Sequence, residues 1–481
     1  MRTEKDFIGE KQVPEDALYG IHSLRAQENF PDETPFHIEW YKAMAIVKKA
    51  CFVTAKDYFS KTAEKFNTDS PNLRTIDESL LNTLIESTTE CEEGEHFEHF
   101  IVPAISGGAG TSINMNMNEI IANISLIKLG HKPGEYSYLD PIEHVNLFQS
   151  TNDVVPTALR VALMRLLNVL EESINFSRSC TEEIEKKYRD ALRIGYTQMQ
   201  EAVPTTFGRL FSSYSDALSR DWWRISKCNE RIKVVNLGGS AIGTSITVPR
   251  YFVTEVVRTL QSLSGLPVTR GENLVDSTNN LDPFVEIHGI LKAHAVNLEK
   301  MVSDLRLLSS DTFGNKEIEI PNKQVGSSIM PGKINPVIPE FVISSVHRVY
   351  SNDILITSLC AQGCLELNAY LPIIGHALIE SLKLLISCNQ SMKLHLFDGL
   401  NINADVAKLK VYHSPSITTA LLPYIGYNKA AEMAKYMKKN NKDIFKANEE
   451  LKFIEENKLR IILKPENLVR GGFSVKDLMD D

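Results

Sequence analysis

The segment FVEIHGILKAHAVNLEKMVSDLRLLSS, residues 284–310, shows the pattern that decides the fold class. Its apolar side chains recur three or four residues apart, at Phe284, Ile287, Leu291, Ala295, Leu298, Val302 and Leu305. This spacing places them on one face of an α-helix, and the segment contains no proline that would break the helix. The sequence therefore predicts a long helix with one side buried against other elements.

The same pattern recurs in other parts of the chain. Leucine or isoleucine occupies every third or fourth position at Leu159, Leu163, Leu166, Leu170 and Ile174. Residues 341–361 and 373–388 also read as helices, and residues 378–386 are apolar on more than one side. Helices that bury several faces are typical of a bundle, and a bundle shared among subunits would provide such burial. Convincing strands with alternating polarity are scarce, so we expect a mainly α protein.

We divide the chain into three predicted domains. Residues 1–150 form an N-terminal, mostly helical domain, residues 151–403 a central helix-bundle domain, and residues 404–481 a small helical C-terminal domain. Within the first domain, the glycines of residues 107–110 predict a flexible break before a helix. Ser112 or Asn114 is the expected cap of that helix.

Composition and charge exclude several classes of function. The chain has 481 residues, 43% of them hydrophobic, and a net charge of −9, which argues against nucleic-acid binding. Its seven cysteines form no CxxC pair, which fits a reducing cytosol and gives no sign of a metal. Neither a secretory signal nor an apolar run of membrane-spanning length is visible. We therefore expect a cytoplasmic protein with neither a nucleic-acid nor a membrane partner.

Four stretches combine small hydroxyls, amides and glycine in a way that a pure core does not need. They are GGAGTSINMNMNE (107–119), QSTNDVVPT (149–157), GYTQMQEAVP (195–204) and GSSIMPGKINPVIPE (326–340). Each has an ordinary explanation when taken alone; STND before a long apolar helix, for example, is a good helix-capping signal. Together they supply the short hydrogen-bond donors and the cation that would hold a small dicarboxylate.

The fourth stretch adds a candidate for proton abstraction. Lys333 and Asn335 lie two residues apart, so an extended backbone would point both toward one carboxylate. The loop at Gly326–Ser327–Ser328 offers backbone N–H groups that can form an anion-holding nest. A serine there can act as a base if these groups and a cation stabilise its alkoxide. No GxSxG motif supports a serine hydrolase instead.

Three of these stretches carry a family resemblance. GAGTSINMNMNEIIAN, STND and GSSIMPGKINPVIPE, in this order and at these separations, resemble the three polar regions of the aspartase/fumarase superfamily of lyases. The segments LYGIHSLRAQENF, LGHKPGEYSYLDPIEHVN and IGYNKAAEMA are most similar to its aspartase branch, the L-aspartate ammonia-lyases. The resemblance covers nearly the whole chain and implies reversible conversion of L-aspartate to fumarate and ammonia.

The resemblance also implies roles for individual residues. Ser327 would be the general base that removes a proton from C3 of aspartate, under a loop that closes with the backbone N–H groups of residues 328–330. The implied substrate-binding residues are Ser150, Thr151 and Ser328 for the β-carboxylate that becomes an aci-carboxylate, Thr197, Lys333 and Asn335 for the α-carboxylate, and Asn152, Thr111 and Gln198 for the amino group.

The family fold implies how the site is assembled. Three mostly helical domains form a homotetramer through a central helix bundle, and each active site draws its regions from three subunits. The partners implied are a small dicarboxylate and other copies of this chain. The implied reaction needs no organic cofactor, and we predict no metal site.

Two departures from the family pattern concern the site. Many relatives carry histidine where this chain has Gln198, and glutamine can act neither as an acid nor as a base. The segment DTFGNKEI (311–318) lacks the Pro-Arg pair of the family's GPRAGLxEI-like run. Gln198 argues against fumarate hydration, whereas the altered segment keeps open a lyase acting on an N-substituted aspartate. A structural or binding homologue without catalysis is the remaining alternative, although Ser327, Lys333 and STND argue against it.

Overall fold

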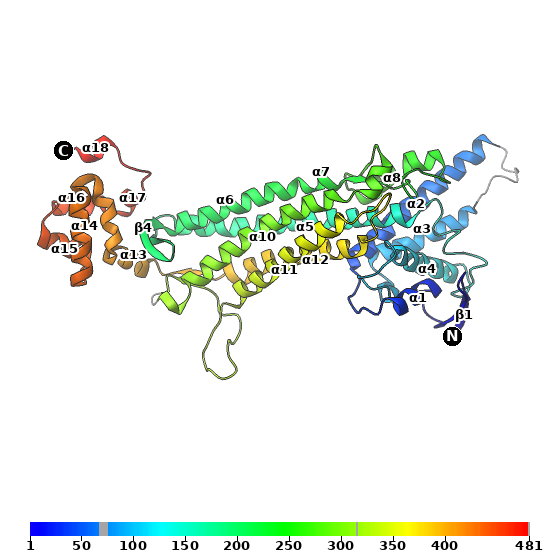
Figure 1. Ribbon diagram of the computed structural model, residues 1–481, viewed down its shortest axis with the longest axis horizontal. Helices are drawn as coiled ribbons and strands as arrows, with labels where there is room; N and C mark the ends of the chain where they lie inside the picture. The colour runs from blue at the N-terminus through cyan, green and yellow to red at the C-terminus, as the bar shows by residue number, and fades with distance from the viewer. Residues whose placement is uncertain (67–75, 314–315, 480–481) are drawn as a thin grey trace. The chain divides into compact units, whose positions relative to one another are not determined.

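The structure is a computed structural model that describes residues 1–66, 76–313 and 316–479. It is mainly helical, as predicted, and Figure 1 labels the elements. The chain forms two compact units. The first comprises residues 1–171, 223–293 and 347–385, and the second comprises residues 172–222, 294–346 and 386–481. The predicted division into three domains stays a prediction.

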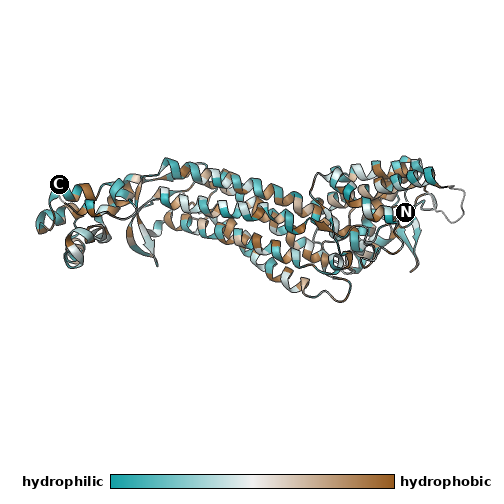
Figure 2. Cartoon of the chain, turned by 90° about the horizontal axis from the view of Figure 1, so that it is seen from above, coloured by the Kyte–Doolittle hydropathy of each residue, from teal (hydrophilic) through white to brown (hydrophobic). Residues whose placement is uncertain are grey.

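Long helices dominate the chain and contribute residues to both units. They are α5 (Thr151–Lys187), α6 (Phe207–Ser226), α10 (Asp282–Leu308), α11 (Val337–Cys360) and α12 (Leu371–Ser391). Every apolar position predicted to face the core on α5 and α10 is buried, with at most 8% of its surface exposed. Figure 2, coloured by residue hydropathy, shows brown, apolar positions recurring along the long helices among teal, polar ones. The three- and four-residue spacing therefore predicted both the helices and their buried faces.

The first unit also holds the long helix α2, of 28 residues, and shorter elements around an apolar core. They are β1 (Arg2–Lys5), β2 (Glu10–Val13), α1 (Ile21–Asn29), α2 (Ile38–Lys65), α3 (Glu78–Glu93), α4 (Thr111–Lys128), α7 (Cys228–Ile232), β5 (Val234–Val235), α8 (Arg250–Ser264), β6 (Thr269–Arg270) and α9 (Leu274–Asn279). Helix α2 supplies some of the largest fully buried side chains, including Trp40, Tyr41, Phe52 and, unusually, Lys48.

In the second unit, a β-hairpin packs with the C-terminal helices. The hairpin pairs β3 (Leu192–Thr197) with β4 (Gln200–Thr206) in antiparallel register. Further elements are β7 (Ile318–Glu319), β8 (Asn401–Ile402), α13 (Ala404–His413), α14 (Leu422–Asn440), α15 (Ile444–Leu451), α16 (Glu456–Ile462), α17 (Pro465–Leu468) and α18 (Val475–Leu478). A π-helix, Met392–Phe397, directly follows α12. Leu192 and Ile194 belong to one apolar cluster with Val411, Ile417 and Leu421.

Two predicted helix starts had different outcomes. Helix α4 begins at Thr111 after Gly110, whose φ of 91° suits glycine, so the predicted capping by Ser112 or Asn114 is wrong. At the start of α5, the hydroxyl of Ser150 accepts the Asn152 N–H at 3.2 Å, and the Asp153 carboxylate accepts the Ser150 N–H at 2.9 Å. These reciprocal bonds make the capping arrangement that STND predicts.

One described helical stretch, Leu371–Phe397, is long and apolar enough to cross a membrane by length and composition alone. The protein buries 67% of the most apolar window of this stretch. Burial of this extent is typical of a core helix, whose apolar faces are covered by its neighbours.

Candidate active site

In the first unit, one asparagine links the first two polar stretches. Asn114 lies three residues after the exposed Thr111, and therefore on the same side of α4. Its amide donates to Asn146 Oδ1 at 2.9 Å and to Thr151 Oγ1 at 3.3 Å. The sequence prediction did not include Asn114 among the site residues, although its helical spacing from Thr111 was a usable signal.

A third segment of the first unit holds Asn152 in place. The Asn152 side chain donates to the carbonyl of Ala241 at 2.7 Å, and Asn236 donates to the carbonyl of Asn152 at 2.8 Å. Asn236 is 2% exposed and also donates to Thr278 Oγ1 at 2.9 Å. The segment 236–241 therefore fixes both the backbone and the side chain of Asn152. The prediction of site residues missed this segment.

Asp153 is the buried anchor of this arrangement. Its carboxylate accepts the N–H groups of Ser150 at 2.9 Å, Gly238 at 3.2 Å and Ser240 at 3.0 Å, and the residue is 0% exposed. One side chain thus ties the start of α5 to the segment 238–240. Asp153 adjoins the predicted Asn152, but nothing in the local sequence shows that two of its donors come from a distant segment.

A buried cation accompanies this carboxylate. Burial raises the pKa of Asp153 to about 7, while its backbone donors and Lys48 act in the opposite direction. Burial also lowers the pKa of Lys48, which is 0% exposed, to about 7, and the nearby Cys51 and Asp153 oppose that shift. The Lys48 ammonium donates to Gln149 Oε1 at 2.9 Å. Each group thus favours the charged form of the other in a dry environment.

Of the predicted first-unit site residues, Asn152 lines a small cavity. A space of about 10 Å³ is bounded by Asn152 together with Ala109, Pro156, Thr278, Leu281, Leu367, Asn368 and Leu371. This volume holds about one water molecule. A substrate that contacts Asn152 therefore needs walls that this pocket does not provide.

In the second unit, Thr197 and Gln198 lie at the exposed tip of the β3–β4 hairpin. The two residues of the turn, Gln198 and Met199, have φ values of 51° and 61°. Positive φ at both central positions characterises the tight type I′ hairpin turn. The Gln198 side chain is thus presented from the turn of a hairpin.

The Ser327 loop lies between α10 and α11 and can be followed in Figure 1 as the yellow-green excursion. Ser327 Oγ accepts the backbone N–H groups of Ile329 at 3.2 Å and Met330 at 2.9 Å. The loop is closed at its base, because Gly326 donates to the Lys333 carbonyl at 2.8 Å. A hydroxyl held by two N–H donors is stabilised most when it carries a negative charge.

The two other predicted residues of this loop differ in their environment. The Asn335 amide donates to the Gly326 carbonyl at 2.8 Å, so it supports the loop itself. Lys333 and Ser328 are exposed, as are the apolar side chains of Val325, Ile329 and Met330. Of the altered segment 311–318, Asp311–Phe313 forms a 3₁₀ turn, residues 314 and 315 lie outside the described residues, and Ile318 is fully buried.

The ten predicted residues thus fall into two groups. Thr111, Ser150, Thr151 and Asn152 belong to the first unit, where Asn114 joins the two stretches that carry them. The second unit contains Thr197, Gln198, Ser327, Ser328, Lys333 and Asn335. Each group is at least partly exposed, so both can reach a ligand.

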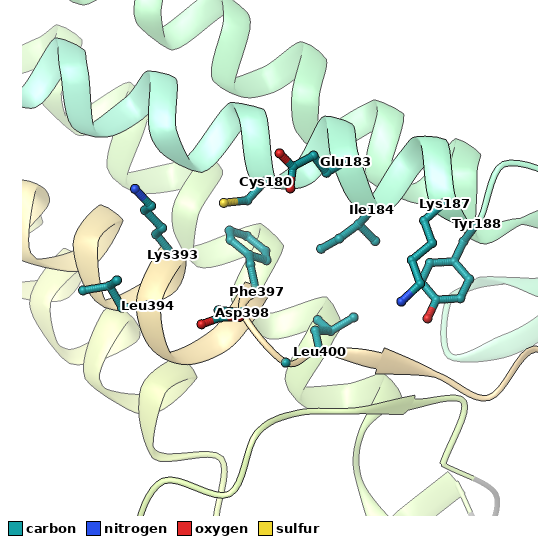
Figure 3. Close-up of a pocket in the computed structure, with 11 residues that line it drawn as sticks. Cys180, Glu183, Ile184, Lys187, Tyr188, Lys393, Leu394, Phe397, Asp398 and Leu400 are labelled. Atoms are coloured by element: carbon teal, nitrogen blue, oxygen red, sulfur yellow. The ribbon is translucent and has the colours of Figure 1, made fainter.

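Other candidate features contain none of the predicted residues. A cavity of about 420 Å³ lies between α5 and the π-helix Met392–Phe397 that follows α12, lined by Cys180, Lys187, Lys393, Phe397 and Asp398 among others (Figure 3). Among the residues that the structure describes, Glu90, Glu95 and His96 bring ligand atoms within 4.8 Å of one another. The Lys128 ammonium, 2.6 Å from Glu90, already neutralises that carboxylate, so we assign no metal to the group.

Comparison with known proteins identifies the family. Residues 9–351 match the lyase family, and residues 417–470 match the fumarase C C-terminus. An aspartate ammonia-lyase of Bacillus subtilis is 36% identical and covers 100% of this chain and 98% of its own length. A solved structure from Brucella melitensis, described as a fumarate lyase:delta crystallin bound to cobalt, is 36% identical and has a TM-score of 0.88. It covers 96% of this chain and 98% of that one.

A class II fumarase from Schistosoma mansoni supports the fold alone. It is 24% identical, with a TM-score of 0.87 over 98% of this chain and 100% of that one. The family match extends over more than half of the chain and agrees with the full-length similarity to the Bacillus protein. This chain therefore belongs to the lyase family of the aspartase/fumarase superfamily, and it is an enzyme of the lyase class.

Proposed function

We propose that this enzyme is a carbon–nitrogen lyase, an L-aspartate ammonia-lyase that reversibly converts L-aspartate to fumarate and ammonia. The observation that carries the proposal is the environment of Ser327, whose Oγ accepts two backbone N–H groups at 2.9 and 3.2 Å. Lys333 follows in the same loop and supplies the cation that an alkoxide or a carboxylate requires.

In the proposed reaction, the Ser327 alkoxide removes a proton from C3 of aspartate. The electron pair of the broken C–H bond moves into the β-carboxylate, which becomes a doubly charged aci-carboxylate. Ser150, Thr151 and Ser328 donate hydrogen bonds to it, and such donors accelerate the step if they bind this intermediate more strongly than the substrate. Thr197, Lys333 and Asn335 hold the α-carboxylate, which changes little during the reaction.

Gln198 fits ammonia loss better than water loss. The amino group of aspartate is already protonated, so it departs as neutral ammonia when the C–N bond breaks, and no acid is needed. Loss of hydroxide from malate does require an acid, because hydroxide is a poor leaving group. The Gln198 amide cannot supply that proton. With Asn152 and Thr111, it can only orient the leaving group through hydrogen bonds.

We further propose that the chain works as a homotetramer in which three subunits build each site. Exposed site residues support this proposal. Thr197 and Gln198 lie at a hairpin tip, and the Ser327 loop leaves Ile329 84% and Val325 76% exposed. Several exposed apolar side chains gathered on one loop can mark a surface that a partner or a ligand covers. The small cavity at Asn152 likewise leaves most of a substrate without walls.

One substrate panel tests the proposed reaction. The purified enzyme is incubated separately with L-aspartate, L-malate and an N-substituted aspartate, and fumarate is followed by its ultraviolet absorbance. We expect fumarate from L-aspartate, and aspartate from fumarate plus ammonia in the reverse direction. Fumarate from malate or from the substituted substrate, but not from L-aspartate, would identify one of the other lyases. No turnover of any substrate would favour a binding or structural homologue.

A mixing experiment tests the shared site. Ser327→Ala and Thr151→Ala variants, each inactive as a pure assembly, are unfolded together and refolded as mixed assemblies. If different subunits contribute these residues, some sites in the mixture contain both native side chains and regain activity. A mixture that stays as inactive as its components, although the chains have mixed, contradicts the shared site.

A further inference from the structure

A cavity of about 420 Å³ in the second unit contains none of the proposed active-site residues. One of its walls is the end of α5, and the other is the π-helix Met392–Phe397 with the turn that follows it. All of its lining residues belong to one chain and one unit, so the cavity exists whichever subunits complete the proposed active site. Its volume suits a small organic molecule.

The geometry of the two helices explains how both walls face the cavity. The lining residues on α5 and directly after it are three or one positions apart, which places them on one side of the helix: Cys180, Glu183, Ile184, Lys187 and Tyr188. In the wider turn opposite, the Asp398 N–H donates to the carbonyl of Lys393, five residues earlier, at 3.2 Å. This turn brings four residues to the cavity, namely Lys393, Leu394, Phe397 and Asp398. Single π turns are rare and occur frequently at functional sites.

The cavity has an apolar floor and a charged rim. Phe397 and Leu400 line it and are only 5% and 7% exposed. The charged lining residues are more accessible, since three are exposed and one is half-buried: Glu183, Lys187, Asp398 and, half-buried, Lys393. Among the residues that the structure describes, none of these four charged groups forms an ion pair or a hydrogen bond. All four charges therefore remain available to a ligand.

One end of the cavity is cationic. Figure 3 shows Lys187 and Tyr188 together at one end, apart from Lys393 and Asp398. The Lys187 ammonium lies 4.9 Å from the centre of the Tyr188 ring, an arrangement that favours the charged form of the lysine. Glu183 lies one turn before Lys187 on α5, but Figure 3 shows the lysine turned toward Tyr188 instead. Lys187 can therefore bind an anion at this end.

The other end carries two carboxylates and one ammonium, a net charge of −1. Burial raises the pKa of the Cys180 thiol, the carboxylates of Glu183 and Asp398 raise it further, and the Lys393 ammonium lowers it. The three charges therefore surround this end of the cavity. The Lys393 ammonium also lies 4.0 Å from the centre of the Phe176 ring, which holds it by a cation–π contact. Both carboxylates remain to bind a cation.

We propose that this cavity binds an ω-amino acid, a zwitterion whose ammonium and carboxylate stand at opposite ends of an apolar chain. The carboxylate pairs with Lys187, the ammonium pairs with Asp398, and the chain covers the Phe397 ring. Cys180 and Lys187 mark the two ends and are seven residues apart on α5, so the ends are separated by about 10 Å along the helix. An α-amino acid carries both charges at one end and reaches only one of these groups. The inference does not rest on the proposed function, because binding is measured without turnover.

Two isomeric amino acids test the separation of charges. 6-Aminohexanoate and L-norleucine contain the same atoms, but the first carries its charges at opposite ends and the second carries them at one end. The assembled wild-type enzyme is titrated with each by ligand-observed NMR, and hexanoate and hexylamine serve as probes with a single charge. We expect 6-aminohexanoate to bind with a millimolar Kd and roughly threefold or more tighter than the other three compounds. No saturable binding, as when a neighbouring subunit covers the cavity, or tighter binding of L-norleucine, overturns the proposal.

Matched variants locate the probe. Lys187→Gln removes the proposed partner of the carboxylate, and Lys186→Gln makes the same change at an exposed neighbour that does not line the cavity. Asp398→Asn and the exposed Asp405→Asn form the corresponding acidic pair. Lys187→Gln and Asp398→Asn should each weaken binding of 6-aminohexanoate roughly threefold or more, and the two controls should match the wild type. All four side chains are exposed, so every variant should fold. Equal affinities in Lys187→Gln and Lys186→Gln contradict the proposal.

Two further measurements separate this cavity from the proposed active site, where Lys333 can also attract a carboxylate. Lys333→Ala should leave the affinity for 6-aminohexanoate unchanged, and binding lost in Lys333→Ala but kept in Lys187→Gln would place the probe in the active site instead. Labelling of the half-buried Cys180 by N-ethylmaleimide, followed by mass spectrometry, should slow about twofold at a probe concentration equal to Kd. Labelling of the exposed Cys364 should not change. Unaltered labelling of Cys180 at saturating probe overturns the assignment to this cavity.

Discussion

Replacing Asp153 by asparagine should loosen the start of α5 and slow the reaction. The carboxylate accepts three backbone N–H groups, from Ser150 on one side and from Gly238 and Ser240 on the other. An asparagine has one oxygen and one NH₂ group. In its best orientation, the oxygen faces Gly238 and Ser240, while the NH₂ group faces the N–H of Ser150 and leaves it without an acceptor.

The magnitude follows from these three bonds. An orphaned buried donor costs about 1–3 kcal/mol, and each remaining bond loses about 1 kcal/mol when its acceptor is no longer charged. Burial of the charge itself is unfavourable, as the pKa of about 7 for Asp153 reflects, so its removal offsets part of the loss. We therefore expect Asp153→Asn to lower the free energy of unfolding by about 2–4 kcal/mol.

The assay combines unfolding with kinetics. Urea unfolding is followed by far-ultraviolet circular dichroism at one fixed protein concentration, because assembly contributes to stability. The matched control is Asp216→Asn at an exposed carboxylate of α6, which should change stability by less than about 0.5 kcal/mol.

Kinetics should separate Asp153 from a purely structural residue. Ser150 and Thr151 are proposed to bind the aci-carboxylate, which exists only after proton removal, so their displacement should lower kcat roughly tenfold or more and leave KM within about threefold. An Asp153→Asn enzyme with the stability of the Asp216→Asn control and unchanged kcat would refute this reasoning.

The remaining predictions concern the base, the cation and acid stability. Ser327→Ala should lower turnover by roughly 10² or more and leave the assembly intact by light scattering, whereas Ser344→Ala should be silent; near-wild-type turnover in Ser327→Ala contradicts its role as the base. Lys333→Ala should raise KM for L-aspartate about tenfold or more, and an unaltered KM shows that the ammonium does not hold the carboxylate. Burial lowers the pKa of His37, which hydrogen-bonds His376 at 2.9 Å, to about 4. His37 takes up a proton near pH 6.5 in the unfolded chain but only near pH 4 in the folded chain. The free energy of unfolding should therefore fall by about 2–3 kcal/mol as the pH drops from 6.5 to 4. His37→Gln should reduce that loss of stability. Thermal melts with the same pH dependence in the wild type and in His37→Gln would contradict the role given to His37.

The helices were predictable because their signal is local. Every residue that defines the apolar face of α10 lies within one segment, so its spacing alone reports the helix and its buried side. The β3–β4 hairpin gave a much weaker signal, since only Leu192, Ile194 and Tyr196 alternate. Its turn is formed by Gln198 and Met199 rather than by a glycine pair, although both have positive φ. Its strands are held by the distant C-terminal cluster that contains Val411 and Ile417.

In the candidate site, too, contacts between residues close in sequence could be predicted, whereas contacts with distant segments could not. Ser150 and Asp153 cap α5 as their spacing predicts, because both partners lie in one turn. The other donors to Asp153 come from residues 238 and 240, which no local pattern connects to it. The hydrogen bonds to Ser327 Oγ were open to prediction, since they arise within three residues. The buried Glu317 contacts β3 and α13, and these contacts depend on how the second unit folds.

Charge balance explains why a buried carboxylate in each unit has cationic neighbours. A dicarboxylate is repelled by any unpaired anion near its site, and this chain carries a net charge of −9. Asp153 is accompanied by the buried Lys48, so the anchor of Ser150–Asn152 adds no net charge when both are ionised. In the second unit, the buried Glu317 accepts the Tyr196 hydroxyl at 2.8 Å and has two cationic neighbours, Arg193 and Lys410, which leave its cluster positive by one. Neither buried carboxylate is therefore an unpaired anion, which is consistent with the anionic substrate proposed for this enzyme.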